Sequence, residues 1–160
     1  MLRPAVRTLL VLSAAPLAAL TAQTPAQPAT SAGAARFHAG TSTSPLSSIV
    51  EVGNTLYLSG MLGTGADGQL VAGGIEPETR LTMENIRAAL GRVGATMDDV
   101  VKCTVFLADM AERDRMNAIY ATFFPRHKPA RSAVGVNGLA RNARVEIECL
   151  AVRGAGGPAR

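Results

Sequence analysis

Arg131 lies near the start of a predicted strand, two residues after Pro129, where a side chain can face a cleft. A guanidinium binds a carboxylate through two parallel hydrogen bonds, which fix the position and the orientation of the bound acid. The alternative is a surface arginine whose aliphatic stem packs on the sheet. The sequence therefore offers Arg131 as a candidate for binding a small carboxylate.

Two glutamates, Glu146 and Glu148, lie two residues apart on another predicted strand and therefore point to the same face of the sheet. The rest of that strand is mostly apolar. A partly buried carboxylate accepts a proton from water when its pKa lies near the working pH. The alternative is that both acids form salt bridges with arginines such as Arg131 or Arg144. The pair therefore contains a candidate general base.

Other chemistries are less well supported. No histidine accompanies Ser59 in a motif, so a triad nucleophile is not expected there. His38 and His127 are separated from each other and from both cysteines, so no metal site is predicted. An oxidising compartment would permit a disulfide between Cys103 and Cys149, but both lie inside predicted strands, where a small buried thiol is commoner. We therefore expect two free, buried thiols.

The elements that position these residues follow from turn signals and apolar periodicity. A hairpin is predicted over Ser47–Val52 and Thr55–Ser59, turning at Gly53-Asn54. A glycine-containing loop, residues 60–74, follows; it lacks the G-x-G-x-x-G pattern that opens a phosphate-binding helix. An amphipathic helix then begins near Pro77 and ends at Gly94, with an apolar stripe at three- and four-residue spacing. The stripe consists of Met83, Ile86, Leu90 and Val93.

The second half of the domain repeats this alternation. A strand at Val100–Leu107 is followed by a helix over Ala111–Phe124, which Asp109 can cap and Pro125 ends. Strands at Ala130–Val136 and Arg144–Val152 complete the order β-β-α-β-α-β-β. This order predicts an α+β fold with one mixed sheet and both helices on one face. Apolar residues on both sides of the strands predict that identical subunits cover the second face.

The N-terminus has the pattern of an export signal. Arg3 and Arg7 precede a nearly continuous apolar stretch, Thr8–Leu20, and small residues end it at Ala22. We predict a cleavable signal peptide over residues 1–22, a disordered linker over 23–36 and one globular domain over 37–155. The alternative is an uncleaved anchor, but the apolar stretch is shorter than the roughly 20 residues a span needs. A periplasmic or secreted protein without a stable membrane anchor is therefore expected.

The charge of the chain does not suggest a nucleic-acid partner. The formal net charge is +4, and loss of Arg3 and Arg7 would leave it near +2 (4 − 2). No run of lysine and arginine alternates with aromatic residues, so nucleic-acid binding is not predicted.

Several segments, taken in order, resemble the RidA (YjgF-type) family of imine and enamine deaminases. Any one of them is a weak signal, but the ordered set covers roughly Ser44–Arg153 with the spacing of the family. The segments are Leu56–Gly60, Val100–Asp109, Met116–Tyr120 with Phe123-Phe124, Pro129–Ser132, and Val145–Glu148 continuing into Ala151-Val152.

The resemblance implies a chorismate-mutase-like fold and a barrel-like homotrimer with a cleft at each subunit interface. The implied reaction is hydrolysis of reactive 2-imino acids, such as 2-iminobutanoate, or of their enamine tautomers, to 2-oxo acids and ammonia, with no cofactor or metal. By position in the motifs, Arg131 is implied to bind the substrate carboxylate and Glu146 to activate water. Ser59 and Gly60 are implied to line the cleft, and Asn117 to face the subunit contact, although a helix-surface hydrogen bond would serve Asn117 equally well.

Two positions depart from the family pattern. Leu46, after Pro45, replaces a tyrosine that many members carry near the mouth of the cleft. Ala133 takes the cleft position two residues after Arg131 where many members carry cysteine, which removes a reactive thiol. Both departures affect the expected rate and substrate range more than the assignment of Arg131 and Glu146.

Three other functions stay open at the level of sequence. The trimer could bind a small carboxylate without catalysis, or act as a holdase that shields other chains with its apolar faces. A chorismate-mutase-type rearrangement would need several cations around a dicarboxylate, and the sequence offers one strong candidate, Arg131.

Overall fold

The computed structural model describes residues 33–40 and 44–157 of the chain, within one compact unit that spans Ala32–Arg160. The predicted signal peptide, residues 1–22, and most of the predicted linker therefore lie outside the described residues. Within the described part, no helix combines the length and the hydrophobicity that crossing a membrane requires.

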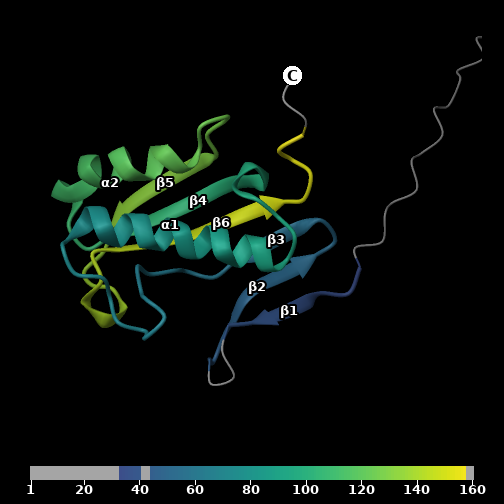
Figure 1. The fold of residues 1–160 in the computed structure, drawn as a ribbon, viewed down its shortest axis with the longest axis horizontal. Coiled ribbons are helices and arrows are strands. Elements are labelled where there is room, and N and C mark those ends of the chain that lie inside the picture. Colours follow the sequence, from purple (N-terminus) through teal and green to yellow (C-terminus); the bar gives the residue numbers. More distant parts are fainter. Residues whose placement is uncertain (1–32, 41–43, 158–160) are drawn as a thin grey trace, which may run out of the picture. The chain divides into compact units, whose positions relative to one another are not determined.

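A six-stranded sheet forms the centre of the domain, with the strand order β1-β2-β3-β6-β4-β5. β4 and β5 run parallel, and the other neighbours are antiparallel, so the sheet is mixed as predicted. Both helices cover the same face, which we call the helix face; the opposite side is the open face (Figure 1). The strands are β1 (Arg36–Ala39), β2 (Ser47–Val52), β3 (Thr55–Leu58), β4 (Val100–Leu107), β5 (Ala130–Gly135) and β6 (Val145–Val152).

β1 is the one strand that the sequence did not predict. It pairs antiparallel with β2 at the edge of the sheet, with an irregularity between His38 and Ala39. It begins at Arg36, one residue before the predicted start of the domain. The strand has four residues, most of them exposed, so it carries no alternating apolar pattern. Pairing with β2, rather than its own composition, makes this segment a strand.

The first helix, α1 (Ile75–Arg92), matches its prediction, with Pro77 in the first turn and Gly94 just beyond the end. Three residues of its predicted apolar stripe, Met83, Ile86 and Leu90, are fully buried against the helix face of the sheet, and Val93, just beyond the helix, is partly buried. Burial of each such side chain stabilises the fold by about 1.5 to 3 kcal/mol. This packing fixes the helix layer over the central strands.

The second predicted helix is α-helical only in its middle, α2 (Arg113–Tyr120). The 3-10 turns Met110–Glu112 and Ala121–Phe123 flank it, as is common at helix ends. Asp109 accepts a hydrogen bond from the backbone nitrogen of Ala111 at 2.8 Å, as the capping prediction required. Two further 3-10 turns, Met97–Asp99 and Ala140–Asn142, precede β4 and β6.

Arg144 ties both helices to the beginning of β6. Its side chain donates to the buried carboxylate of Glu112 at 2.8 Å, and its backbone nitrogen donates to the buried carboxylate of Glu78 at 2.8 Å. Glu78 belongs to α1, and Glu112 precedes α2. This clamp therefore fixes the strand end that carries Glu146.

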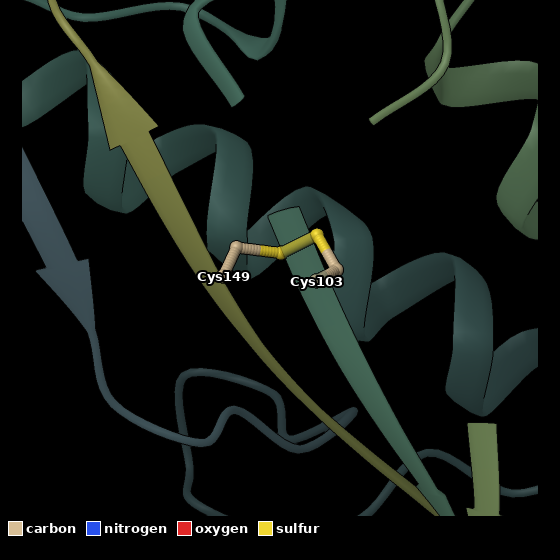
Figure 2. Close-up of a disulfide and its surroundings, with 2 residues drawn as sticks. All are labelled: Cys103 and Cys149. Atoms are coloured by element: carbon tan, nitrogen blue, oxygen red, sulfur yellow. A yellow bond between two sulfur atoms is a disulfide. The ribbon is translucent and has the colours of Figure 1, made fainter. Parts of the chain in front are cut away.

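The cysteines are disulfide-bonded, so the expectation of two free thiols is wrong. Cys103 of β4 and Cys149 of β6 lie directly opposite each other in antiparallel register, with Cα atoms 4.1 Å apart. Both are buried in the core on the helix face, and Figure 2 shows the bond that joins their strands. Directly opposed residues bring their Cβ atoms close enough to be bridged. The expectation failed because the sequence does not reveal the register between β4 and β6.

Candidate active site

Glu146 lies on the open face of β6, and its carboxylate is placed directly against Gly60. A Cβ atom built on Gly60 would lie 1.9 Å from Oε1 of Glu146, far inside van der Waals contact. Only glycine leaves room for the carboxylate at this position. Met61 pairs with Ile147 in a short antiparallel bridge, which holds the Gly60 backbone beside β6. The structure thus brings together two of the predicted site residues.

The environment of Glu146 favours its protonated form. Burial raises the pKa of the Glu146 carboxyl above its usual value of 4.5, and the nearby negative charge of Glu148 raises that pKa further. Within the described residues neither glutamate forms an ion pair, and Arg144, one of the partners considered, pairs with Glu112 instead. The alternative that both acids are salt-bridge partners is therefore not what this part of the chain shows. A partly desolvated carboxylate without a cationic partner is suited to accept a proton from water.

A hollow beside Gly60 is bordered by a strained loop. Its lining includes Met61, Leu62, Thr64, Asn85 and Arg141. Arg141 and its neighbour Asn142 adopt left-handed backbone conformations, with φ values of 61° and 58°. Such conformations are uncommon for residues other than glycine and concentrate at functional sites. This loop carries no signal in the sequence that would mark it as part of a site, since neither residue type requires a positive φ.

The loop that carries Gly60 is held from both sides. The side-chain nitrogen of Asn85 on α1 donates to the carbonyl oxygens of Leu62 and Thr64 at 2.9 and 3.0 Å. The Ser59 hydroxyl donates to the carbonyl oxygen of Ser47 at 2.7 Å. Ser59 therefore fixes the end of β3 to β2, and its hydroxyl proton is already engaged in that bond.

Arg131 occupies a different environment, at the edge strand β5. Its guanidinium carbon lies over the ring of Tyr120, 4.8 Å from the ring centroid. Within the described residues it forms neither an ion pair nor a hydrogen bond through its side chain, so its N–H donors are available to a ligand. In the sequence Tyr120 stands out only as the end of a segment that resembles the family, and no signal there linked it to Arg131.

Two buried oxygen atoms near the C-terminal end of α2 have no hydrogen-bond partner in the described structure. They are Oδ1 of Asn117 and the hydroxyl of Tyr120, one helical turn apart. Burial raises the pKa of the Tyr120 hydroxyl to about 12, and the positive charge of Arg131 offsets part of that rise. Buried polar atoms usually have a partner, so this end of α2 calls for a further group to complete it.

Arg131 and Glu146 do not meet within one chain. In the β5-β4-β6 register, Arg131 is level with the buried Cys103, while Glu146 is level with Phe106. Cys103 lies on the helix face, and Phe106, three residues further on, lies on the open face. Lys102 and Ser132, the open-face neighbours of these positions, contact each other at 2.8 Å. One chain therefore presents the guanidinium and the carboxylate on opposite faces of its sheet.

The two positions that depart from the family pattern, Leu46 and Ala133, add no polar group near Glu146 or Arg131. Ala133 follows Arg131 on the same side of β5 and is partly buried against the core. Leu46 is 54% exposed, beside a short turn in which Ser44 bonds its backbone. Neither residue contributes a polar atom to the groups around Glu146 or Arg131.

Comparison with known families gives one match that covers nearly all of the domain. The model described as Endoribonuclease L-PSP matches residues 37–153. A 2-iminobutanoate/2-iminopropanoate deaminase of Mus musculus is 43% identical over 111 residues, which span 69% of this chain and 82% of the mouse protein. A RutC family protein of Pyrococcus horikoshii is 39% identical over 110 residues, spanning 68% of this chain and 87% of that protein.

Solved structures show the same arrangement of elements. A Thermotoga maritima protein described as a candidate endoribonuclease superposes with a TM-score of 0.70 and 41% identity, covering 74% of this chain and 97% of its own. E. coli TdcF with bound serine superposes with a TM-score of 0.65 and 32% identity, covering 69% of this chain and 89% of its own. The α+β fold predicted from the sequence is thereby confirmed.

Proposed function

The chain belongs to the endoribonuclease L-PSP family, the YjgF or RidA family, and we propose that it is an imine deaminase. Its substrates would be reactive 2-imino acids and their enamine tautomers, which it would hydrolyse to 2-oxo acids and ammonia. The mouse relative is named for this reaction on 2-iminobutanoate and 2-iminopropanoate. The proposed reaction uses side chains of the protein and no metal or organic cofactor.

The observation that carries this proposal is the placement of Glu146. Its carboxylate is seated on Gly60, partly removed from water and without a cationic partner in the described residues. A carboxylate that only stabilised the fold would be expected to have a basic partner or full solvation. A base with a raised pKa, seated on a glycine that itself lines a hollow, fits the activation of a water molecule.

The proposed reaction begins when the Arg131 guanidinium binds the substrate carboxylate through two hydrogen bonds. Glu146 then accepts a proton from a water molecule as the water oxygen forms a bond to the imine carbon. Glu146 returns this proton to the imine nitrogen, which gives a carbinolamine. Glu146 then accepts the proton of the carbinolamine hydroxyl and passes it to the nitrogen, so that the carbon–nitrogen bond breaks and the nitrogen leaves as ammonia. One water is consumed, and the carbon atom ends as the carbonyl of a 2-oxo acid.

The opposite placement of Arg131 and Glu146 means that a single chain cannot supply both groups to one substrate. We propose that the site is completed in a homotrimer, where the β5 edge of one subunit approaches the open face of the next. The exposed apolar side chains support such a contact: Phe37 is 71% exposed and Tyr57 is 48% exposed. In the β1-β2-β3-β6 register, Phe37, Val50, Tyr57 and Leu150 form one row across the open face.

We further propose that the protein acts after export, in the periplasm or outside the cell. The N-terminal pattern of residues 1–22 supports this location, and so does the disulfide, because disulfides persist mainly in oxidising compartments. Imines formed there by oxidation of amino acids would be the substrates. Mass spectrometry of the protein from its own cells would find the mature N-terminus near residue 23; an intact Met1 would contradict the proposal.

Deamination is tested by release of ammonia from 2-imino acids generated enzymatically in the assay. Arg131→Ala and Glu146→Gln are each expected to lower kcat/KM roughly 100-fold or more, because the first removes the group that binds the substrate carboxylate and the second the group that activates water. Wild-type activity no greater than that of both variants would reject the proposal. Binding of 2-oxobutanoate without ammonia release would favour a non-catalytic carboxylate binder, and protection of aggregating proteins regardless of Arg131 would favour a holdase.

A further inference from the structure

We infer that Tyr120 is the positioning residue of the site: its ring holds the guanidinium of Arg131 in the orientation that receives the substrate carboxylate. This inference rests on the proposed function, since it assigns the partner of the carboxylate-binding group. It concerns Tyr120, whose place on α2 would otherwise suggest packing alone.

The Tyr120 ring is itself held firmly. Only 5% of the residue is exposed, and its ring packs against the ring of the buried Phe124, with centroids 5.0 Å apart and planes tilted by 48°. Tyr120 is the last residue of α2, where the chain tightens into a 3-10 turn. A ring fixed on one side by the core offers a rigid surface to the cation on the other.

The backbone beneath Arg131 is fixed as well. Arg131 on β5 is in register with Cys103 on β4, and Cys103 is bonded to Cys149 on β6. The three residues therefore form one row across three strands, in which the disulfide joins the two residues next to Arg131. Since β5 pairs with a crosslinked strand at this row, the Tyr120 ring acts on the part that pairing does not fix, the long side chain of Arg131.

The type of contact matters for binding. An acidic partner would occupy the N–H donors of Arg131, whereas an aromatic ring attracts the cation through its π face and leaves these donors free. Within residues 33–40 and 44–157 no carboxylate pairs with Arg131, although five of the arginines there form ion pairs with acids. The Arg131 guanidinium is thus held in place and still able to bind a carboxylate through two hydrogen bonds.

The experiment compares Tyr120→Phe, which keeps the ring, with Tyr120→Leu, which removes it. The Kd for 2-oxobutanoate is measured by calorimetry, and KM and kcat are measured with 2-iminobutanoate. We expect Tyr120→Leu to raise Kd and KM about three- to tenfold with kcat changed less than about twofold, and Tyr120→Phe to restore wild-type Kd and KM. A purely structural role would instead lower the amount of active protein without a selective change in KM.

Phe123→Leu is a matched control, because Phe123 makes the other cation–π contact of the described chain, with Arg87 at 5.6 Å. This contact lies away from Arg131, so the variant is expected to keep wild-type Kd and KM. If Tyr120→Leu does not fold, 3,5-difluorophenylalanine at position 120 weakens the ring's attraction for a cation while keeping its shape, and we then expect a higher Kd than with phenylalanine.

The outcomes separate this inference from the proposed function. If the wild type binds 2-oxobutanoate through Arg131 but releases no ammonia, deamination is rejected while the role of Tyr120 is still measured by Kd. If the wild type is active and the ring-removing or fluorinated proteins bind as tightly as Tyr120→Phe, the inference about Tyr120 is overturned alone. Absence of Arg131-dependent binding in the wild type overturns both.

Discussion

The two groups proposed to act on the substrate are built in contrasting ways. Arg131 is placed on the helix face by packing and pairing: its strand β5 pairs with β4, which the disulfide joins to β6, and Tyr120 holds its side chain. Glu146 is placed on the open face by the absence of a side chain at Gly60 and by the clamp of Arg144 at the start of β6. Arg131 thus depends on a side chain that packs against it, whereas Glu146 depends on the absence of a side chain at Gly60.

This contrast follows from the chemistry of the two groups. A guanidinium stays charged at any working pH, so its surroundings need only orient it while leaving its donors free. A carboxylate that acts as a base needs a pKa close to the working pH, which requires partial removal of water and no cationic neighbour. Orienting a guanidinium therefore favours packing contacts around it. Raising the pKa of a carboxylate favours close packing without a cationic partner.

The largest expected effect comes from the disulfide, which belongs to the Arg131 side. Replacing both Cys103 and Cys149 by alanine is expected to lower the free energy of unfolding by about 3 to 4 kcal/mol, because the bond closes a loop with a sequence separation of 46. Equilibrium urea unfolding measures the change. The same variant should weaken binding of 2-oxobutanoate, because Cys103 is in register with Arg131. It should change less the fall of activity at low pH, because the Glu146 side chain points to the opposite face of the sheet.

The control for this prediction is the reductant. Under equilibrium conditions, reductant should destabilise the wild type toward the double-alanine protein and leave the double-alanine protein itself unaffected. Equal stability of the oxidised wild type and the double variant would contradict the prediction, and the disulfide would then have no stabilising role.

On the Glu146 side, Gly60→Ala is expected to lower kcat about 100-fold, because a displacement of about 1 Å in a catalytic group has effects of that size. The added Cβ would occupy the space of the Glu146 carboxylate. Gly91→Ala is the matched control: Gly91 lies in α1, and a Cβ there meets nothing within 4 Å. Gly91→Ala should keep full activity, and an equally active Gly60→Ala would show that Glu146 need not sit on this glycine.

The sequence predicted several strands and the candidate residues well, but it did not predict the contacts between distant segments. Strands β2 and β4 were placed at their observed bounds, because their β-branched residues and turns are local signals. The residue type at Arg131 and the two-residue spacing of Glu146 and Glu148 made these residues candidates, and the resemblance to the RidA family implied the roles of Arg131 and Glu146. Gly60 was expected at the cleft, but its contact with Glu146 was not, since that contact joins segments 86 residues apart (146 − 60).

What could not be predicted depends on register. A shift of one residue between β4 and β6 would turn every side chain to the other face, and no local pattern determines that choice. For this reason the disulfide was not expected, and neither was the opposite orientation of Arg131 and Glu146 within one chain. The strand β1 was missed for a related reason, because it owes its conformation to its pairing with β2.

A mixing experiment tests whether the two sides meet between subunits. Arg131→Ala and Glu146→Gln subunits are unfolded together in equal amounts and refolded. If each site takes Arg131 from one subunit and Glu146 from the next, about a quarter of the sites in randomly mixed trimers contain both intact groups. Recovery of about a quarter of wild-type activity is therefore expected. Activity no higher than that of the separate variants would show that both groups act from one chain or that one of them has no role.

The smallest expected effect concerns Glu148, which tunes Glu146 without touching the Arg131 side. The negative charge of Glu148 raises the pKa of the Glu146 carboxyl, in addition to the larger effect of burial. A base works only when it is deprotonated, so activity falls as the pH drops through the pKa of Glu146. Glu148→Gln removes the second cause and keeps the first, and the acid limb of kcat/KM should therefore move to lower pH but not to the limit of an exposed glutamate. A shift to higher pH, or a changed KM for the substrate carboxylate with no shift of the limb, would mean that Glu148 acts on the substrate and not on Glu146.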